Sequence, residues 1–148
     1  MRKKSENYTV VEFPAKSSNE SFARAVTACF AAQLDPSLDE LGDIRTAVSE
    51  AVTNAIVHAY PQEIGKIRLR LAVYEGQLLE IQVRDWGCGI ADVEQAKEPM
   101  YTTGGEERSG MGFLIMESFM DKLSVRSLVG GGTTVTMRRR IHKRGIER

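Results

Sequence analysis

The sequence is short of several features that would each point to a particular class of protein. Its longest apolar stretches, such as residues 30–34 and 113–116, fall far below the roughly 18–20 residues of a membrane-spanning helix. The basic start, residues 1–4, leads into polar residues rather than the apolar core of a secretory signal. The two cysteines, Cys29 and Cys88, form neither a metal-binding spacing nor a disulfide framework. We therefore expect a cytoplasmic protein without membrane attachment.

The chain also lacks net charge, because 20 Lys and Arg residues balance 20 Asp and Glu residues. Affinity for nucleic-acid backbones comes from an excess of basic side chains, so we expect no direct nucleic-acid binding. Basic residues do gather in a C-terminal tail, at about 141–148. One short basic run is a weak signal, and a solvated tail is its simpler interpretation.

No internal repeat is visible, and a length of 148 residues predicts a single domain, residues 1–148. A hydrophobic fraction of 42% with 27% charged residues is typical of a globular protein.

The first half of the chain predicts one strand and two helices. Residues 8–13 read as a strand closed by Pro14. A helix should then end near Leu34. Its core stripe is Phe22, Ala25, Val26, Cys29 and Phe30, so Cys29 is expected to be a small core residue. Ser37-x-x-Glu40 is a capping box for a second helix that stops at Tyr60-Pro61. The core stripe of this second helix is Leu41, Ile44, Val48, Ala51, Val52 and Ala55.

The second half predicts a hairpin, a long irregular segment, and then a helix and two strands. Apolar and polar residues alternate over 67–73 and 79–84, as in two antiparallel strands with one wet face. Glycines interrupt residues 87–112, which indicates a lid at about 91–110, with at most a short helix near 93–97. The order of elements predicts an α+β fold: a two-layer α/β sandwich with a mixed, mainly antiparallel sheet covered on one face by helices.

Glu50 and Asn54 lie one helical turn apart, on a face that is not the predicted core stripe. They can be ordinary solvated residues, although Ala47 and Val57 on the same face would suit a covered surface. The alternative is that both side chains have a chemical function. An amide oxygen such as that of Asn54 can bind Mg²⁺, and the Glu50 carboxylate can accept the proton of a hydroxyl that attacks a phosphate.

Two glycine motifs follow the hairpin. Asp85-x-Gly87-x-Gly89 can be a tight turn, or a site where the carboxylate binds an exocyclic amine such as that of adenine. Gly110-Met111-Gly112 can be an ordinary loop-to-helix junction, or a helix start whose N–H groups bind phosphate. Nearby, Arg108 could reach a terminal phosphate or be a flexible surface residue, and Thr134 could be a plain strand threonine.

The order of these three motifs resembles the GHKL ATPase and kinase superfamily, whose members have the Bergerat fold with an ATP lid. Residues 48–55, 108–113 and 115–121 are most similar to the anti-sigma F factors, a family of bacterial serine kinases. The resemblance implies that Asn54 binds Mg²⁺, Glu50 is the general base, Asp85 recognises adenine, and Arg24 contacts partner proteins. The nucleotide-binding positions that it implies, for ATP or ADP, are Asn54, Asp85, Gly87, Gly89, Thr102, Thr103, Arg108, Ser109, Gly110, Met111, Gly112 and Thr134.

The chain departs from the family pattern in two places. Trp86 and Cys88 replace smaller residues in the adenine loop, and the lid reads Thr102-Thr103-Gly104-Gly105 where Lys-Pro is more usual. These changes bear on lid dynamics and nucleotide affinity rather than on the fold.

The resemblance implies two linked activities. The protein would bind and inhibit a sigma factor of the sigma F type, and it would use ATP to phosphorylate a serine of an anti-anti-sigma factor. It also implies a homodimer. Two alternatives are a general-stress anti-sigma kinase of the sister branch and a nucleotide-gated binding module without phosphotransfer.

Overall fold

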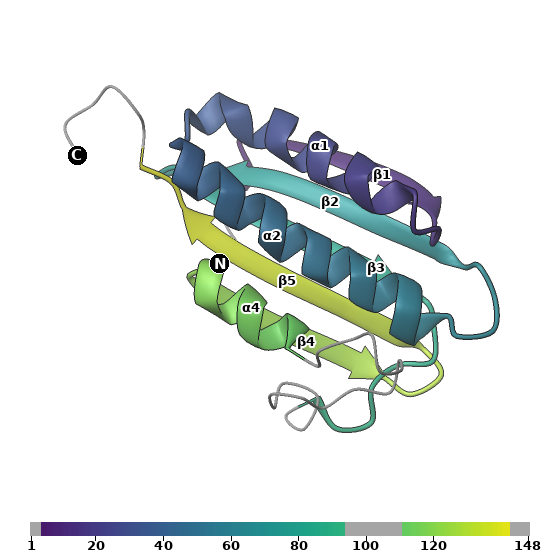
Figure 1. Ribbon diagram of the computed structural model, residues 1–148. Helices are drawn as coiled ribbons and strands as arrows, with labels where there is room; N and C mark the ends of the chain where they lie inside the picture. The colour runs from purple at the N-terminus through teal and green to yellow at the C-terminus, as the bar shows by residue number, and fades with distance from the viewer. Residues whose placement is uncertain (1–3, 94–110, 143–148) are drawn as a thin grey trace.

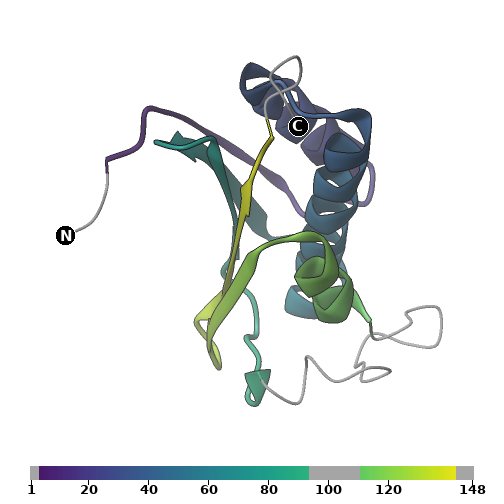
Figure 2. The same ribbon diagram turned by 90° about the vertical axis from the view of Figure 1, so that its left-hand side faces the viewer.

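The computed structural model describes residues 4–93 and 111–142 and shows two layers, a five-stranded sheet and a layer of helices on one of its faces (Figure 1, Figure 2). This confirms the predicted fold class. The elements are β1 (Asn7–Pro14), α1 (Asn19–Ala31), η1 (Ala32–Leu34), α2 (Leu38–Asn54), η2 (Ala55–Ala59), β2 (Lys66–Tyr74), β3 (Leu78–Asp85), α4 (Gly112–Phe119), β4 (Lys122–Leu128) and β5 (Gly132–Arg140).

The sheet has the strand order β1-β2-β3-β5-β4, and each of its four pairings is antiparallel. The parallel component of the predicted mixed sheet is therefore absent from the described residues. The reason is the position of β5. β4 follows helix α4 and runs parallel to β3, as is usual for a strand after a helical crossover. However, β5 inserts between β3 and β4, so these two parallel strands do not pair.

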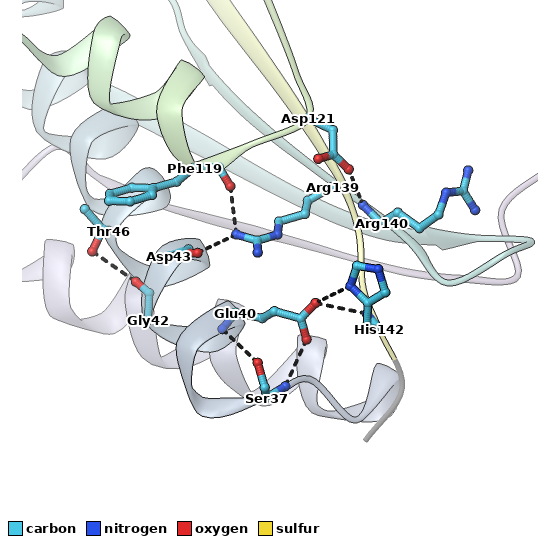
Figure 3. A network of polar contacts seen from close by, with 10 residues as sticks. All are labelled: Ser37, Glu40, Gly42, Asp43, Thr46, Phe119, Asp121, Arg139, Arg140 and His142. Carbon is cyan, nitrogen blue, oxygen red and sulfur yellow. Dashed lines mark hydrogen bonds and ion pairs between the residues drawn. The ribbon is translucent and has the colours of Figure 1, made fainter. Parts of the chain in front are cut away.

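The capping box that begins α2 is confirmed. Ser37 accepts a hydrogen bond from the Glu40 amide at 3.1 Å, and Glu40 accepts one from the Ser37 amide at 3.0 Å. The Glu40 carboxylate also receives the His142 amide at 3.0 Å, so the start of α2 is tied to the chain just after β5 (Figure 3). One capping motif thus joins the helical layer to the sheet.

Arg139 of β5 makes a second connection between the layers. Its guanidinium donates to Asp43 of α2 and to the Phe119 carbonyl of α4, both at 2.8 Å (Figure 3). Because the carbonyl belongs to the last turn of α4, this arginine satisfies a helix C-terminus as well as an acid. It fixes α2 and α4 over the same strand.

The predicted core stripe of α1 is only partly correct: Val26 and Phe30 are partly buried against the core, but the other three residues of the stripe are exposed. Cys29 and Phe22 are exposed, and the residues of α1 that are buried are Ala23, Thr27 and Ala31. These are small side chains, which allow α1 to pack closely against α2, and the Thr27 hydroxyl donates to the Ala23 carbonyl at 2.8 Å. Phe22 instead packs edge-on against Phe13 at the rim of the core, with ring centroids 5.9 Å apart.

Within the described residues, no helix is both long and apolar enough to cross a membrane.

Candidate active site

Glu50 and Asn54 lie on the side of α2 that faces the start of α4. A Cβ atom on Gly112 would lie 3.2 Å from Asn54 Oδ1, Asn54 Nδ2 and Glu50 Oε2. The first residue of α4 therefore sits directly against both polar side chains, and a glycine there leaves them room. The packing of α4 on α2 also explains why Ala47, on the same face, is completely buried.

Asp85 ends β3 and turns its side chain into the protein, where it is 6% exposed. Its Oδ1 atom accepts hydrogen bonds from the Gly87 amide at 3.0 Å and the Thr133 amide at 3.1 Å. Burial raises the pKa of the Asp85 carboxyl, and the two amide hydrogen bonds offset that rise only in part. Both hydrogen bonds use Oδ1, so the carboxylate is held by one of its two oxygens.

The loop after Asp85 is wedged between η2 and the β4–β5 turn. A Cβ atom on Gly87 would be 2.2 Å from the Ala59 carbonyl oxygen, and the Cys88 amide donates to that same oxygen at 3.0 Å. Gly89 has a φ of +79°, and a Cβ on it would be 2.3 Å from the Leu128 carbonyl oxygen. Both glycines are therefore required by close backbone contacts.

The contacts of Gly87 and Gly112 bring three distant segments of the chain together. Gly112 packs on Asn54 at the end of α2, and Gly87 packs on Ala59 at the end of η2, which continues from Asn54. The end of the long helix is thus bordered by α4 on one side and by the Asp85 loop on another. Figure 1 shows the end of α2, the end of β3 and the start of α4 at the same end of the molecule.

The structure does not bring Thr134 to Asp85. Thr134 is paired with Arg84, and strand alternation places it on the face of the sheet away from the helices. Its neighbour Thr133 lies on the Asp85 side, is 8% exposed, and supplies the amide that binds the carboxylate. The sequence offers two adjacent threonines, and only the register of β5 decides which one faces the site.

Several predicted site residues lie outside the described part of the chain. They are Thr102, Thr103, Arg108, Ser109 and Gly110, together with most of the predicted lid and with residues 143–148 of the basic tail. Met111 is described and precedes α4, where its carbonyl accepts the Ile115 amide at 2.9 Å.

Arg24 belongs to a polar cluster between α1 and α2. Glu20 accepts a hydrogen bond from Ser49 at 2.7 Å and from Thr53 at 3.0 Å, and it also pairs with Arg24. Burial raises the pKa of Glu20, but these hydrogen bonds and the charge of Arg24 outweigh it and hold the pKa below its usual value.

The sequence interpretation missed Glu20, Ser49 and Thr53. The spacing of Glu20 and Arg24, four residues apart on one helix, was the signal that could have found the pair. The cluster is adjacent to Glu50, because Ser49 precedes Glu50 in the chain. A shallow groove of 360 Å³ is lined by residues that include Arg24, Arg45, Ser49 and Glu50.

The donor set limits what could bind at the end of α2. Among the described residues, no group of three His, Cys, Asp or Glu side chains could hold a metal ion by itself. Asn54 and Glu50 offer an amide oxygen and a carboxylate side by side, which suits a hard cation whose other ligands are water and phosphate.

Comparison with known proteins places the chain in a family. A family model described as a histidine kinase-like ATPase domain matches residues 13–139. The anti-sigma F factor of Caldanaerobacter subterraneus subsp. tengcongensis is 54% identical over 132 residues, which cover 88% of this chain and 92% of that relative. The chain belongs to the anti-sigma F factor family.

A second member of the family, the anti-sigma F factor of Geobacillus thermodenitrificans, is 52% identical over 134 residues, or 90% of this chain and 92% of the relative. Among solved structures, the RsbU and RsbW domains of Rv1364c from Mycobacterium tuberculosis superpose with a TM-score of 0.66 at 20% identity. That match covers 91% of this chain and 32% of the other, and it shows that the two share a fold.

Proposed function

We propose that this chain binds and inhibits a sigma factor of the sigma F type and uses ATP to phosphorylate a serine of an anti-anti-sigma factor. The observation that carries the kinase half is the contact of Gly112, at the start of α4, with Glu50 and Asn54. It combines a candidate base, a candidate cation ligand and the positive end of a helix in one place.

In this proposal, the Asp85 loop binds the adenine base. The Asp85 carboxylate is buried and fixed through Oδ1, so Oδ2 can accept a hydrogen bond from the exocyclic amine. Gly87 and Gly89 let the loop pack closely on Ala59 and Leu128, which fixes the backbone that follows Asp85. The first amides of α4, including that of Gly112, would bind phosphate oxygens.

Asn54 would hold Mg²⁺ through its side-chain oxygen, and the ion would supply charge neutralisation between the phosphates. The same amide group lies against Gly112, so the cation ligand and the phosphate-binding helix start are held in a fixed relation.

Glu50 would act on the incoming serine. Its carboxylate accepts the hydroxyl proton while the serine oxygen forms a bond to the γ-phosphorus and the bond from that phosphorus to the bridging oxygen breaks, which releases ADP. The protein contributes mainly position and charge, because phosphoryl transfer offers little covalent chemistry to side chains. Glu50 also lines the groove shared with Arg24, which provides an approach for a protein substrate.

Arg24 is the proposed contact for partner proteins. Its pairing with Glu20 and its 3.3 Å contact with Ser49 orient the guanidinium at the mouth of that groove. A cytoplasmic location, a homodimer and a dependence of partner choice on ATP or ADP belong to the same proposal.

The decisive experiment compares the parent protein with Glu50→Gln. Each is incubated with γ-labelled ATP and a purified anti-anti-sigma protein, and ATP affinity is measured separately by calorimetry. We expect Glu50→Gln to keep ATP binding but lose most label transfer. Undiminished transfer would refute the base assignment.

Label transfer tests one alternative, and co-purification tests the other. ATP binding with no label on the partner, even for the parent protein, would favour a nucleotide-gated binding module. Co-purification with a general-stress sigma factor instead of a sporulation sigma factor would favour the sister branch.

A further inference from the structure

The sheet face that points away from the helices concentrates the basic side chains of this neutral chain. Buried residues such as Ile67, Ile81 and Val135 face the helices, so the residues that alternate with them face outward (Figure 2). The outward basic residues include Lys66, Arg68, Arg70, Arg84, Lys122, Arg126 and Arg138, and the outward acidic residues are Glu12 and Glu80. We call this surface the open face.

Trp86, the single tryptophan, organises one end of the open face. Arg84 Cζ lies 4.6 Å, Lys66 Nζ 4.7 Å and Arg68 Cζ 5.2 Å from the centroid of its ring. Three cations therefore share one aromatic side chain, whose π electrons attract each of them.

This cluster breaks an ordinary rule of sheet construction. Arg68 and Arg84 are direct partners across β2 and β3, where like charges are destabilising. Glu12 offsets part of the charge by pairing with Arg68 at 2.6 Å and Lys66 at 3.7 Å. Among the described residues, no acidic side chain pairs with Arg84. Violations of local rules are found where a surface serves a function, so the excess charge suggests an anionic partner.

The middle of the open face is already arranged for binding. Glu80 is 5% exposed because Arg138 and Arg70 lie across it, at 2.9 Å and 3.6 Å. Arg70 also stacks over Tyr8, 5.4 Å from its ring centroid. These arginines are fixed before any partner arrives, which lowers the entropy cost of binding.

Exposed apolar side chains border the basic residues. Tyr8 and Val10 of β1 are 60% and 45% exposed, and Leu128 and Val129 at the β4–β5 turn are 71% and 67% exposed. Tryptophan, tyrosine and arginine are the residues that dominate the energetics of protein–protein interfaces.

We propose that the open face docks an acidic segment of a protein partner, one that also carries apolar side chains. A nucleic acid fits less well, because Glu12 interrupts the basic rows and the exposed aliphatic side chains would find no phosphate partner. A second copy of this chain fits less well too, since two open faces would oppose their basic residues. This surface lies across the sheet from Glu50 and does not depend on the proposed kinase activity.

The test uses a short fluorescein-labelled peptide of repeated Glu-Glu-Leu units, with binding followed by anisotropy and by the fluorescence of Trp86. Arg68→Gln/Arg84→Gln should weaken binding about tenfold, as loss of two interface charges commonly does. Lys16→Gln, in the connection from β1 to α1, removes one charge next to the helical layer and should change affinity little. Arg126→Gln changes a single open-face residue on the edge strand β4 and should also weaken binding. It keeps the proposal testable if the double variant does not fold.

Four outcomes would overturn the proposal. They are the absence of peptide binding, equal weakening by Lys16→Gln and Arg126→Gln, tighter binding of an oligothymidylate of matched charge, and dimerisation that the open-face variants abolish. The parent protein should be assayed for peptide binding with and without ATP. A protein that binds the peptide but not ATP would contradict only the proposed kinase function.

Discussion

Glu40, in the first turn of α2, binds His142, two residues beyond the end of β5. One carboxylate oxygen of Glu40 lies 3.0 Å from the His142 amide and 3.1 Å from its ring Nδ1 (Figure 3). Burial raises the pKa of Glu40, but hydrogen bonds from Ser37 and His142 lower it more, to about 2. A single acid thus caps a helix and anchors the end of the sheet.

Glu40→Gln should destabilise the fold by about 1–2 kcal/mol at neutral pH, because glutamine keeps the capping geometry but loses the charged hydrogen bonds. Folding lowers the pKa of Glu40 from 4.5, so its contribution is complete above that pH and is lost as the pH falls toward 2. Urea unfolding at several pH values should show the difference between parent and variant shrinking over that range. A constant difference would contradict the assignment.

Asp85→Asn should abolish most ATP binding without weakening the fold. The amide oxygen can still accept from Gly87 and Thr133, but the amide nitrogen would face the adenine amine as a second donor. Burial raises the pKa of Asp85, so ionisation opposes folding at neutral pH, and the variant should be as stable as the parent or more stable. Calorimetry measures ATP affinity and thermal unfolding measures stability. Asp39→Asn, at an exposed position, is the control.

The raised pKa of Asp85 also predicts a pH dependence of nucleotide binding. Protonation removes the acceptor, so ATP affinity should fall on acidification, beginning at a higher pH than for an ordinary aspartate. Titrations with ATP at a series of pH values check this. An affinity that stays constant down to the ordinary aspartate range would be inconsistent with a carboxylate contact to adenine.

Gly112→Ala should reduce phosphotransfer more than stability. The added methyl group would crowd the ends of Asn54 and Glu50 at 3.2 Å, and these side chains can move only by leaving their positions at the site. Gly42→Ala is a matched control, because no atom lies within 4 Å of a Cβ at that helical position. It should stabilise the fold by about 1 kcal/mol and leave ATP binding unchanged, as measured by unfolding and calorimetry.

Glu20→Gln should weaken partner binding while ATP affinity stays constant. The single glutamine oxygen can accept from only one of Ser49 and Thr53, and its NH₂ group can donate to the other hydroxyl, but the ion pair that orients Arg24 is lost. Affinities for the sigma factor should be measured for Glu20→Gln, Arg24→Gln and the double variant. If Glu20 acts through Arg24, the double variant will bind about as weakly as Arg24→Gln alone. Additive losses would show that Glu20 contacts the partner independently.

Local rules predicted much of this fold because the relevant signals lie within a few residues of one another. The alternation over 67–73 and 79–84 is the pattern of the β2–β3 hairpin, and Ser37-x-x-Glu40 forms its capping box in full. Ala47 also pointed to a covered face on α2, and α4 covers it.

Long-range packing decided what local rules could not. The inward face of α1 follows from how closely α2 approaches, which favours Ala23 and Thr27 over Phe22. Likewise, the choice of Thr133 over Thr134 depends on the register of β5 against β3, and no local pattern in the sequence specifies that register.

The place of β5 inside the sheet has a consequence for synthesis on the ribosome. Of the five strands of this sheet, β5 is the last to emerge, yet it fills a position between two others. Until it arrives, β3 is an edge whose alternate residues, Leu79, Ile81 and Val83, are hydrophobic, and such edges recruit other chains. A chain truncated in the β4–β5 turn would keep four of the five strands, yet it should yield an aggregating product rather than a slightly shortened protein.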